Sequence, residues 1–222
     1  MNKQKWIIRQ TWNNVFFFNY RVDFKQLREI VPKYLELDSL EESYYTSVVP
    51  FQMNNVEFRF LRTLPFNKLN ELNLRTYVKY KGVSGIYFFT LDSNHRLANF
   101  IARNLFNLPY QFNDVKIDQT RHHFDIKARD FSLNASVGKD IVKNSQENFF
   151  VERYNLFTDN GKQVFRGHVS HEPWDLSHLD IDNINEGLNR RFNLTQGELT
   201  SSYYSQSINV SFTPFTYQGS TG

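Results

Sequence analysis

The stretch that decides the fold reads Asn70-Glu-Leu-Asn-Leu-Arg-Thr-Tyr-Val78 and continues through Lys79 and Tyr80. Side chains alternate between the two faces of a β-strand, so every second residue shares a face. One face is polar and carries Glu71, Asn73, Arg75, Tyr77 and Lys79. The other face is mostly apolar and carries Leu72, Leu74, Thr76, Val78 and Tyr80. The pattern predicts either a sheet with one solvated face or a barrel wall whose polar face lines a cavity.

The segments around this strand predict further antiparallel β-structure. Lys81-Gly82 predicts a hairpin turn into a strand that ends near Leu91, and Asn160-Gly161 predicts another because both residues tolerate positive φ. A dense apolar run, Val15 to Val22, predicts a buried strand. The other expected strands are Tyr44 to Phe60 with a bend, two or three strands within Phe112 to Val137, Glu152–Phe157 paired with Gln163–Ser170, and Ser201 to Phe212.

Short helices are expected at three places. Asp23 is a favourable cap for a helix that Pro32 ends. A second helix is expected to start at Asp92 or Ser93 and to stop at Pro109, with one apolar stripe formed by Leu97, Phe100, Ile101 and Leu105. A third is expected near Asn183 to Phe192. We therefore expect one mainly β domain over residues 1–222, a barrel or α+β fold, in which the segment after about 183 is a peripheral helix plus a last strand.

Composition excludes several classes of function. Aromatic residues make up 17% of the chain, which favours strands and a large buried core. The absence of cysteine excludes disulfides, thiolate zinc sites and cysteine nucleophiles. The net charge of +3 comes with no dense basic run, so no nucleic-acid partner is expected. No apolar run approaches the length of a membrane span, so we expect a cytoplasmic protein with no membrane partner.

Several blocks of the chain resemble the YqjF-like family of uncharacterised bacterial proteins, and together they cover roughly residues 5 to 180. The blocks are Phe16 to Asp23, Val31 to Asp38, Asn73 to Val78, Gly85 to Phe89, Ala102-Arg103, Leu108-Pro109-Tyr110, Val151 to Tyr154 and His171-Glu172-Pro173-Trp174. That family is in turn similar to acetoacetate decarboxylase. The resemblance implies a cone-like, largely antiparallel barrel with an interior cavity, but a shared fold does not carry function with it.

The decarboxylase pattern needs a pair of lysines directly after the proline that ends its central helix. Here Pro109 is followed by Tyr110 and Gln111, so the Schiff-base amine is missing from that position. The arginine and one glutamate of the decarboxylase site fall near Asn13 and Thr46, which are uncharged. Lys116 follows at a similar offset to a decarboxylase lysine, but its register on a strand favours solvent.

The cavity candidates are the polar residues that this register or the resemblance places inside: Glu71, Arg75, Tyr77, Tyr87, Arg103, Tyr110 and Glu152. Tyr110 occupies the position of the missing nucleophile. Glu71 and Arg75 are too far apart on one strand to pair directly, so Arg103 or Glu152 is expected to supply a partner. The alternative is a structural ion-pair network. No catalytic residue is assigned, and no cofactor or metal is expected, because His168-x-x-His171 lacks a third ligand.

Three functions remain open at the level of sequence. The favoured one is a barrel in which a fixed set of polar groups orients a small organic ligand, with an anionic ligand as one option. The second is an enzyme that uses Glu71 and Tyr110 for acid/base chemistry on a carbonyl or carboxylate compound. The third is an interaction module, in which the tail, with Tyr203-Tyr204 and Phe212 to Tyr217, packs on a second copy in a homo-oligomer.

Overall fold

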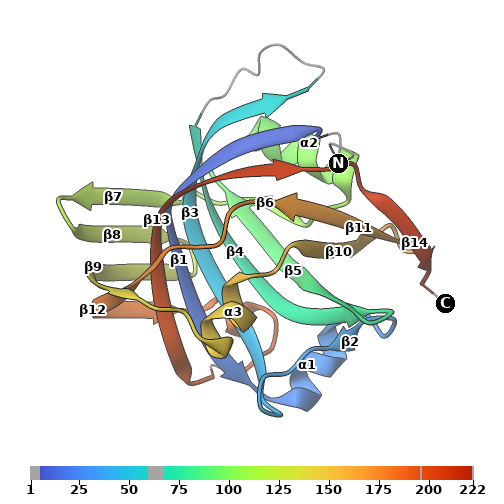
Figure 1. The fold of residues 1–222 in the computed structure, drawn as a ribbon, viewed down its shortest axis with the longest axis horizontal. Coiled ribbons are helices and arrows are strands. Elements are labelled where there is room, and N and C mark those ends of the chain that lie inside the picture. The colour runs from blue at the N-terminus through green and yellow to red at the C-terminus, as the bar shows by residue number, and fades with distance from the viewer. Residues whose placement is uncertain (1–5, 60–67, 196, 222) are drawn as a thin grey trace.

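The protein is mainly β, and its central feature is a closed ring of strands (Figure 1). The computed structural model describes residues 6–59, 68–195 and 197–221. The ring strands are β1 (Ile8–Val22), β3 (Tyr44–Phe58), β4 (Lys68–Tyr80), β5 (Val83–Ser93), β10 (Asn155–Asp159), β11 (Gln163–Ser170) and β13 (Leu199–Phe212). Their order is β11-β10-β5-β4-β3-β1-β13, and the ring closes where β11 pairs with β13. All these pairs are antiparallel except β10 with β5.

A second group of strands continues from β13 to one side of the ring, at the left of Figure 1. It consists of β12 (Leu176–Glu186), β9 (Phe131–Ile141), β8 (His123–Ala128) and β7 (Lys116–Thr120). Three short strands pair elsewhere: β14 (Thr216–Ser220) with β11, β2 (Glu36–Leu37) with β4, and β6 (Tyr110–Phe112) with β5 in parallel. The hairpin turns expected at Lys81-Gly82 and Asn160-Gly161 are confirmed, and Phe60 lies outside the described residues.

The helices follow the predictions only in part. Helix α1 (Phe24–Ile30) is confirmed, with the Asp23 carboxylate accepting from the backbone of Gln26 at 3.0 Å. Helix α2 (Arg96–Phe106) begins later than expected, because the chain stays in β5 through Ser93 and His95 caps the helix. The other helices are α3 (Ser145–Val151) and α4 (Leu188–Arg191). The helix predicted over 183–192 is wrong in its first half, because pairing with β9 extends β12 to Glu186.

The second half of β1 buries both of its faces, which explains its dense apolar run. Phe16 and Phe18 pack outside the ring, in a cluster with Leu72 and Leu74 and with residues of β8 and β9. Phe17 points to the inside, in a second cluster with residues such as Phe51, Tyr77 and Trp174. These three phenylalanines are at most 1% exposed, and each contributes roughly 2–3 kcal/mol of transfer free energy.

Of the four residues in the predicted apolar stripe of α2, only Ile101 faces the interior of the ring. The side chains of Leu97, Phe100 and Leu105 are 45%, 62% and 64% exposed. The helix instead places Ala98, Ile101, Ala102 and Phe106 against the interior of the ring. The expectation of a buried stripe was therefore wrong for Leu97, Phe100 and Leu105, whereas Ile101 packs against the inner cluster.

The C-terminal segment belongs to the centre of the fold. Strand β13 pairs with β1 along almost its whole length, and Tyr203 and Tyr204 are 3% and 6% exposed within the single chain. The ring of Phe215 stacks on Phe106 at 5.4 Å. Tyr203, Tyr204 and Phe215 are therefore packed within the chain itself, whereas Tyr217 is 59% exposed. In the described parts of the chain, no helix has the length and apolar character needed to cross a membrane.

Candidate functional site

The interior of the ring holds a cavity of about 130 Å³, closed on one side by α2. Its wall is mainly apolar and aromatic, including Phe51, Met53, Phe88, Leu91 and Ile101. The polar face of β4 contributes Glu71, Asn73 and Arg75 to this wall. Of the two interpretations of the β4 pattern, the structure therefore supports a wall that lines a cavity.

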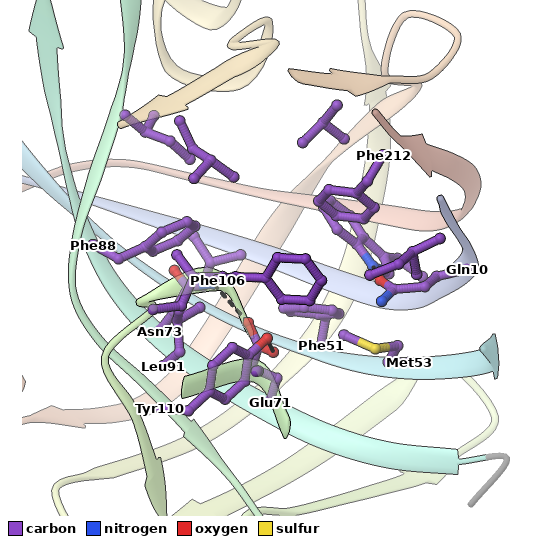
Figure 2. Close-up of a pocket in the computed structure, with 18 of the residues that line it drawn as sticks. Gln10, Phe51, Met53, Glu71, Asn73, Phe88, Leu91, Phe106, Tyr110 and Phe212 are labelled. Atoms are coloured by element: carbon purple, nitrogen blue, oxygen red, sulfur yellow. Dashed lines mark hydrogen bonds between the residues drawn. The ribbon is translucent and has the colours of Figure 1, made fainter. Parts of the chain in front are cut away.

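Glu71 and Tyr110 form a hydrogen-bonded pair in the cavity wall (Figure 2). The Tyr110 hydroxyl donates to Glu71 Oε2 at 2.8 Å, and the Asn73 amide approaches Glu71 Oε1 at 3.4 Å. Strand β6 brings Tyr110 to Glu71, because β6 pairs with β5 at the end where β5 pairs with the start of β4. Tyr110, at the position of the missing nucleophile, thus donates to the Glu71 carboxylate.

Burial sets the protonation of this pair. Glu71 is 2% exposed, and burial raises its pKa from 4.5 to about 7; the hydrogen bonds from Tyr110 and Asn73 oppose this rise and the charge of Asp92 adds to it. The pKa of Tyr110 is raised well above 10.0 by burial and by the neighbouring Glu71 charge. Tyr110 therefore remains a hydrogen-bond donor near pH 7, whereas Glu71 exchanges its proton in that range.

Replacing Tyr110 with Phe is expected to raise the pKa of Glu71 further, because the ionised carboxylate loses its donor. The free energy of unfolding should fall by about 1–2 kcal/mol at pH 8 and by less at pH 5, where Glu71 is protonated. Urea unfolding at the two pH values measures both effects, with Tyr217→Phe at an exposed site as the control. An equal loss at both pH values would contradict the assignment.

A second polar group in the wall contains Arg75 and Trp174. Arg75 is 8% exposed; its Nη2 donates to the carbonyl of Phe150 at 3.0 Å, and its Nε has no hydrogen-bond partner. The indole Nε1 of Trp174 is also buried without a partner. Both side chains pack on the Phe17 ring, with the Arg75 Cζ 5.4 Å and the Trp174 ring 5.1 Å from its centroid.

Arg75 has no carboxylate within ion-pair distance among the described residues. Burial lowers its pKa, but a guanidinium stays charged in proteins. Arg153, the other arginine in the wall, differs because its Nη1 lies 2.8 Å from Asp38. Asp38 also binds Lys79 at 2.9 Å. The cavity wall therefore contains one guanidinium that is paired with a carboxylate and one without a counter-ion.

Arg103 and Glu152 were expected to pair with Glu71 or Arg75, and this prediction was wrong. Glu152 forms a salt bridge with Lys143 and accepts from the Trp174 backbone at 3.0 Å, so it fixes the position of Trp174 instead. Arg103 lies exposed on α2, beside a shallow second pocket that includes Tyr110. The partners of Glu152 and the position of Arg103 depend on contacts between distant segments of the chain, which the alternation within one strand does not predict.

The remaining candidates lie away from the main cavity. The Tyr77 hydroxyl contacts Ser47 and donates to the Phe150 carbonyl at 3.2 Å, inside the apolar cluster. Tyr87 belongs to the outer cluster, where its ring packs edge-on to Phe89 at 5.7 Å. Lys116 pairs with Asp114 at the surface. Among the described residues, no group of three His, Asp or Glu side chains is arranged to hold a metal.

Sequence reasoning did not assign Trp174, His171 or Arg153 to the cavity. All three line it, and His171 packs against Trp174 at 5.2 Å between ring centroids. Burial lowers the pKa of His171, and its Nδ1 contacts the carbonyl of Glu172 at 2.7 Å. The His-Glu-Pro-Trp block was recognised as a motif, and its two aromatic ends are the signal that could have indicated this role.

Comparison with known proteins places the chain in a family. The model of the family DUF2071, described as an uncharacterized conserved protein, matches residues 9–209. The chain belongs to this family. It is also 37% identical over 188 residues to the uncharacterized protein YqjF of Bacillus subtilis, covering 80% of this chain and 78% of the relative. The resemblance seen in the sequence blocks is thereby confirmed.

Solved structures confirm the fold at low sequence identity. Acetoacetate decarboxylase from Legionella pneumophila superposes with a TM-score of 0.73 at 13% identity, covering 99% of this chain and 90% of that one. The enduracididine biosynthesis enzyme MppR complexed with pyruvate gives a TM-score of 0.69 at 12% identity, covering 97% of this chain and 91% of that one. An acetoacetate decarboxylase-like enzyme from Sphingomonas wittichii gives 0.65 at 11% identity, with 97% and 94% covered. At these identities the fold is shared.

Proposed function

We propose that this protein binds a small organic molecule in the cavity of its strand ring. The observation that carries the proposal is the wall itself, in which an apolar aromatic lining encloses a small number of fixed polar groups. Burying Glu71, Tyr110 and Arg75 costs free energy and adds little to the stability of the folded chain, which favours a role for these groups in binding a ligand. MppR, a structural relative, has been solved with pyruvate, which supports a binding role for this type of interior.

The size of the cavity limits the ligand. Its volume of about 130 Å³ is near that of an engineered 150 Å³ cavity that holds benzene. The ligand is therefore a molecule of roughly six to ten non-hydrogen atoms. Native mass spectrometry compared with the denatured mass tests this directly. Extra mass that is lost on denaturation identifies the ligand, whereas a bare chain that also binds none of a panel of small acids, amides and alcohols would contradict the proposal.

Filling the cavity is expected to abolish binding without harming the fold. Ala98 lines the cavity from α2, and Ala98→Leu puts an isobutyl group into the space where the ligand lies. We expect ligand affinity to fall at least tenfold, while the melting temperature stays equal or rises because an empty cavity is filled. Asn104→Leu on the exposed side of the same helix is the control, and affinity there should not change. Unchanged binding in Ala98→Leu would place the ligand elsewhere.

One observation favours an enzymatic use of the same site. The pKa of Glu71, at about 7, lies where a carboxyl can both take and give a proton under neutral conditions, and Tyr110 fixes its orientation. The compatible reactions are proton transfers on small carbonyl or carboxylate compounds. A screen of keto and hydroxy acids with Glu71→Gln as the comparison tests this function. Turnover that is the same in both proteins, or absent throughout the screen, would exclude it.

A further inference from the structure

The two polar groups of the cavity wall, one around Glu71 and one around Arg75, differ in whether their charge can be neutralised. Burial raises the pKa of Glu71, so this carboxyl can become neutral by taking up a proton, and when it is ionised the Tyr110 hydroxyl and the Asn73 amide donate to it. Arg75 has no such route, because a guanidinium does not lose its proton in a protein. A buried charge is normally paired, and leaving one unpaired is costly. The wall thus keeps a positive charge that the described chain does not neutralise.

Neighbouring carboxylates do not fill this role, since they are engaged elsewhere. Asp38 binds Arg153 at 2.8 Å and Lys79 at 2.9 Å. Glu152 binds Lys143 and the Trp174 backbone. Among the charged groups close enough to affect it, Arg75 experiences a further positive charge from Arg153. Any anion that enters the cavity therefore meets a positive potential at this position.

The Trp174 indole is a second donor, and like Arg75 it packs on the aromatic ring of Phe17. The Trp174 indole N–H has no partner, although buried indole nitrogens usually find one. Trp12, another tryptophan of the wall, is different because its Nε1 donates to Gln10 at 2.8 Å. Trp174 is held in place by its backbone N–H, which donates to Glu152, and by its T-shaped packing with the Phe17 ring. The free N–H is therefore a fixed feature of the wall.

Resting on the proposed function, we propose that the ligand is a small monocarboxylate, whose anion is bound by Arg75 and the Trp174 indole and whose apolar body fills the aromatic part of the cavity. A carboxylate has acceptors for both donors and supplies the missing counter-charge. Its body must match a cavity of about 130 Å³, which suits an aromatic ring or a short branched chain. Asn73 and Glu71 then lie further along β4 and are available to polar groups on that body.

The test compares acids with their neutral amides. Benzoate and benzamide, and hexanoate and hexanamide, are titrated into the intact protein by calorimetry. We expect the acids to bind at least tenfold more tightly than the amides. In Arg75→Gln the preference should disappear, with acid affinity reduced about 10- to 100-fold and amide affinity changed less than about threefold. Arg103→Gln removes the same charge from the exposed face of α2 and should leave the preference intact.

The outcomes separate this inference from the proposed function. Amides that bind as tightly as the acids, or a preference that survives Arg75→Gln, would overturn the carboxylate assignment while the binding function stands. Failure of both acids and amides in the unmodified protein would overturn the binding function as well. Retained amide binding in Arg75→Gln shows that its cavity is still folded.

A measurement on the unmodified protein avoids dependence on that variant. The chain has three tryptophans, so its indole N–H resonances are few, and Trp174→Phe assigns the one of interest. We expect benzoate to shift the Trp174 N–H signal strongly, as a free donor gains an acceptor, and benzamide to shift it much less. The Trp6 signal is the internal control because Trp6 does not line the cavity. Equal shifts at both indoles would contradict a carboxylate seated at Trp174.

Discussion

Replacement of Arg191 with Met is expected to lower the free energy of unfolding by about 3–5 kcal/mol. Arg191 lies in α4 and donates through Nη1 and Nη2 to the two carboxylate oxygens of Asp92, each at 2.9 Å. Asp92 is 1% exposed, and burial alone would raise its pKa; the hydrogen bonds from Arg191, Thr90 and Asn113 outweigh this and lower it. Without the guanidinium, a buried carboxylate is left largely uncompensated.

Chemical unfolding at pH 7 measures this loss, which is a large part of the 5–15 kcal/mol typical of a folded domain. The matched control is Arg21→Met, which removes an arginine from an exposed pair with Glu198 at 3.6 Å and should cost less than about 1 kcal/mol. Adding Asp92→Asn to Arg191→Met removes the stranded charge and should recover at least half of the loss. A loss below about 1 kcal/mol in the single variant would mean that α4 does not secure the ring.

Replacement of Glu71 with Gln is expected to stabilise the protein at high pH and to change little at low pH. The pKa of Glu71 rises from 4.5 when unfolded to about 7 when folded. Below pH 4.5 the carboxyl is protonated in both states, so it carries no penalty. As the pH rises from 4.5 to 7, the unfolded chain releases its proton first, and the free energy of unfolding falls. The difference corresponds to an upper limit of about 3 kcal/mol, reached above pH 7.

Thermal unfolding from pH 4 to pH 9 tests this prediction. The gap between Glu71→Gln and the unmodified protein should open between pH 4.5 and 7 and then stay constant. The glutamine oxygen still accepts from Tyr110, and its amide donates to Asn73 Oδ1 once the Asn73 amide turns over, since Asn73 Nδ2 is the atom that approaches Glu71 Oε1. Glu57→Gln on the exposed part of β3 should show no such dependence. A gap that is independent of pH would show that Glu71 is already ionised at acidic pH.

The sequence alone predicted the elements whose signals are local. The alternation of β4, the turns at Lys81-Gly82 and Asn160-Gly161, and the Asp23 cap depend on neighbours within a few residues, and the structure confirms each. The resemblance to the decarboxylase supplied the cavity and pointed to Glu71 and Tyr110. These residues are 39 positions apart, and no local pattern would have paired them.

What could not be predicted depends on contacts between distant segments. The partner of Glu152 is Lys143, because α3 and the turn before Trp174 bring them together, and that leaves Arg75 unpaired. The apolar stripe of α2 has the period of a buried helix face, but three of its four residues are exposed, because a different face of the helix meets the interior of the ring. Whether Arg75 has a counter-ion, and whether the apolar stripe of α2 is buried, depends on how the whole ring of strands assembles.

The two-sided burial of β4 has a consequence for how the chain reaches its native state. Slipping the strand by one residue against β3 would exchange its faces, moving Glu71, Asn73 and Arg75 into the outer apolar cluster. Such a cluster offers these groups few hydrogen-bond partners, and the cost of several kcal/mol per group would exceed the stability of most domains. The polar residues of the cavity therefore also fix the register of β4 against β3, because a ring with the strand shifted by one residue is too unstable to accumulate.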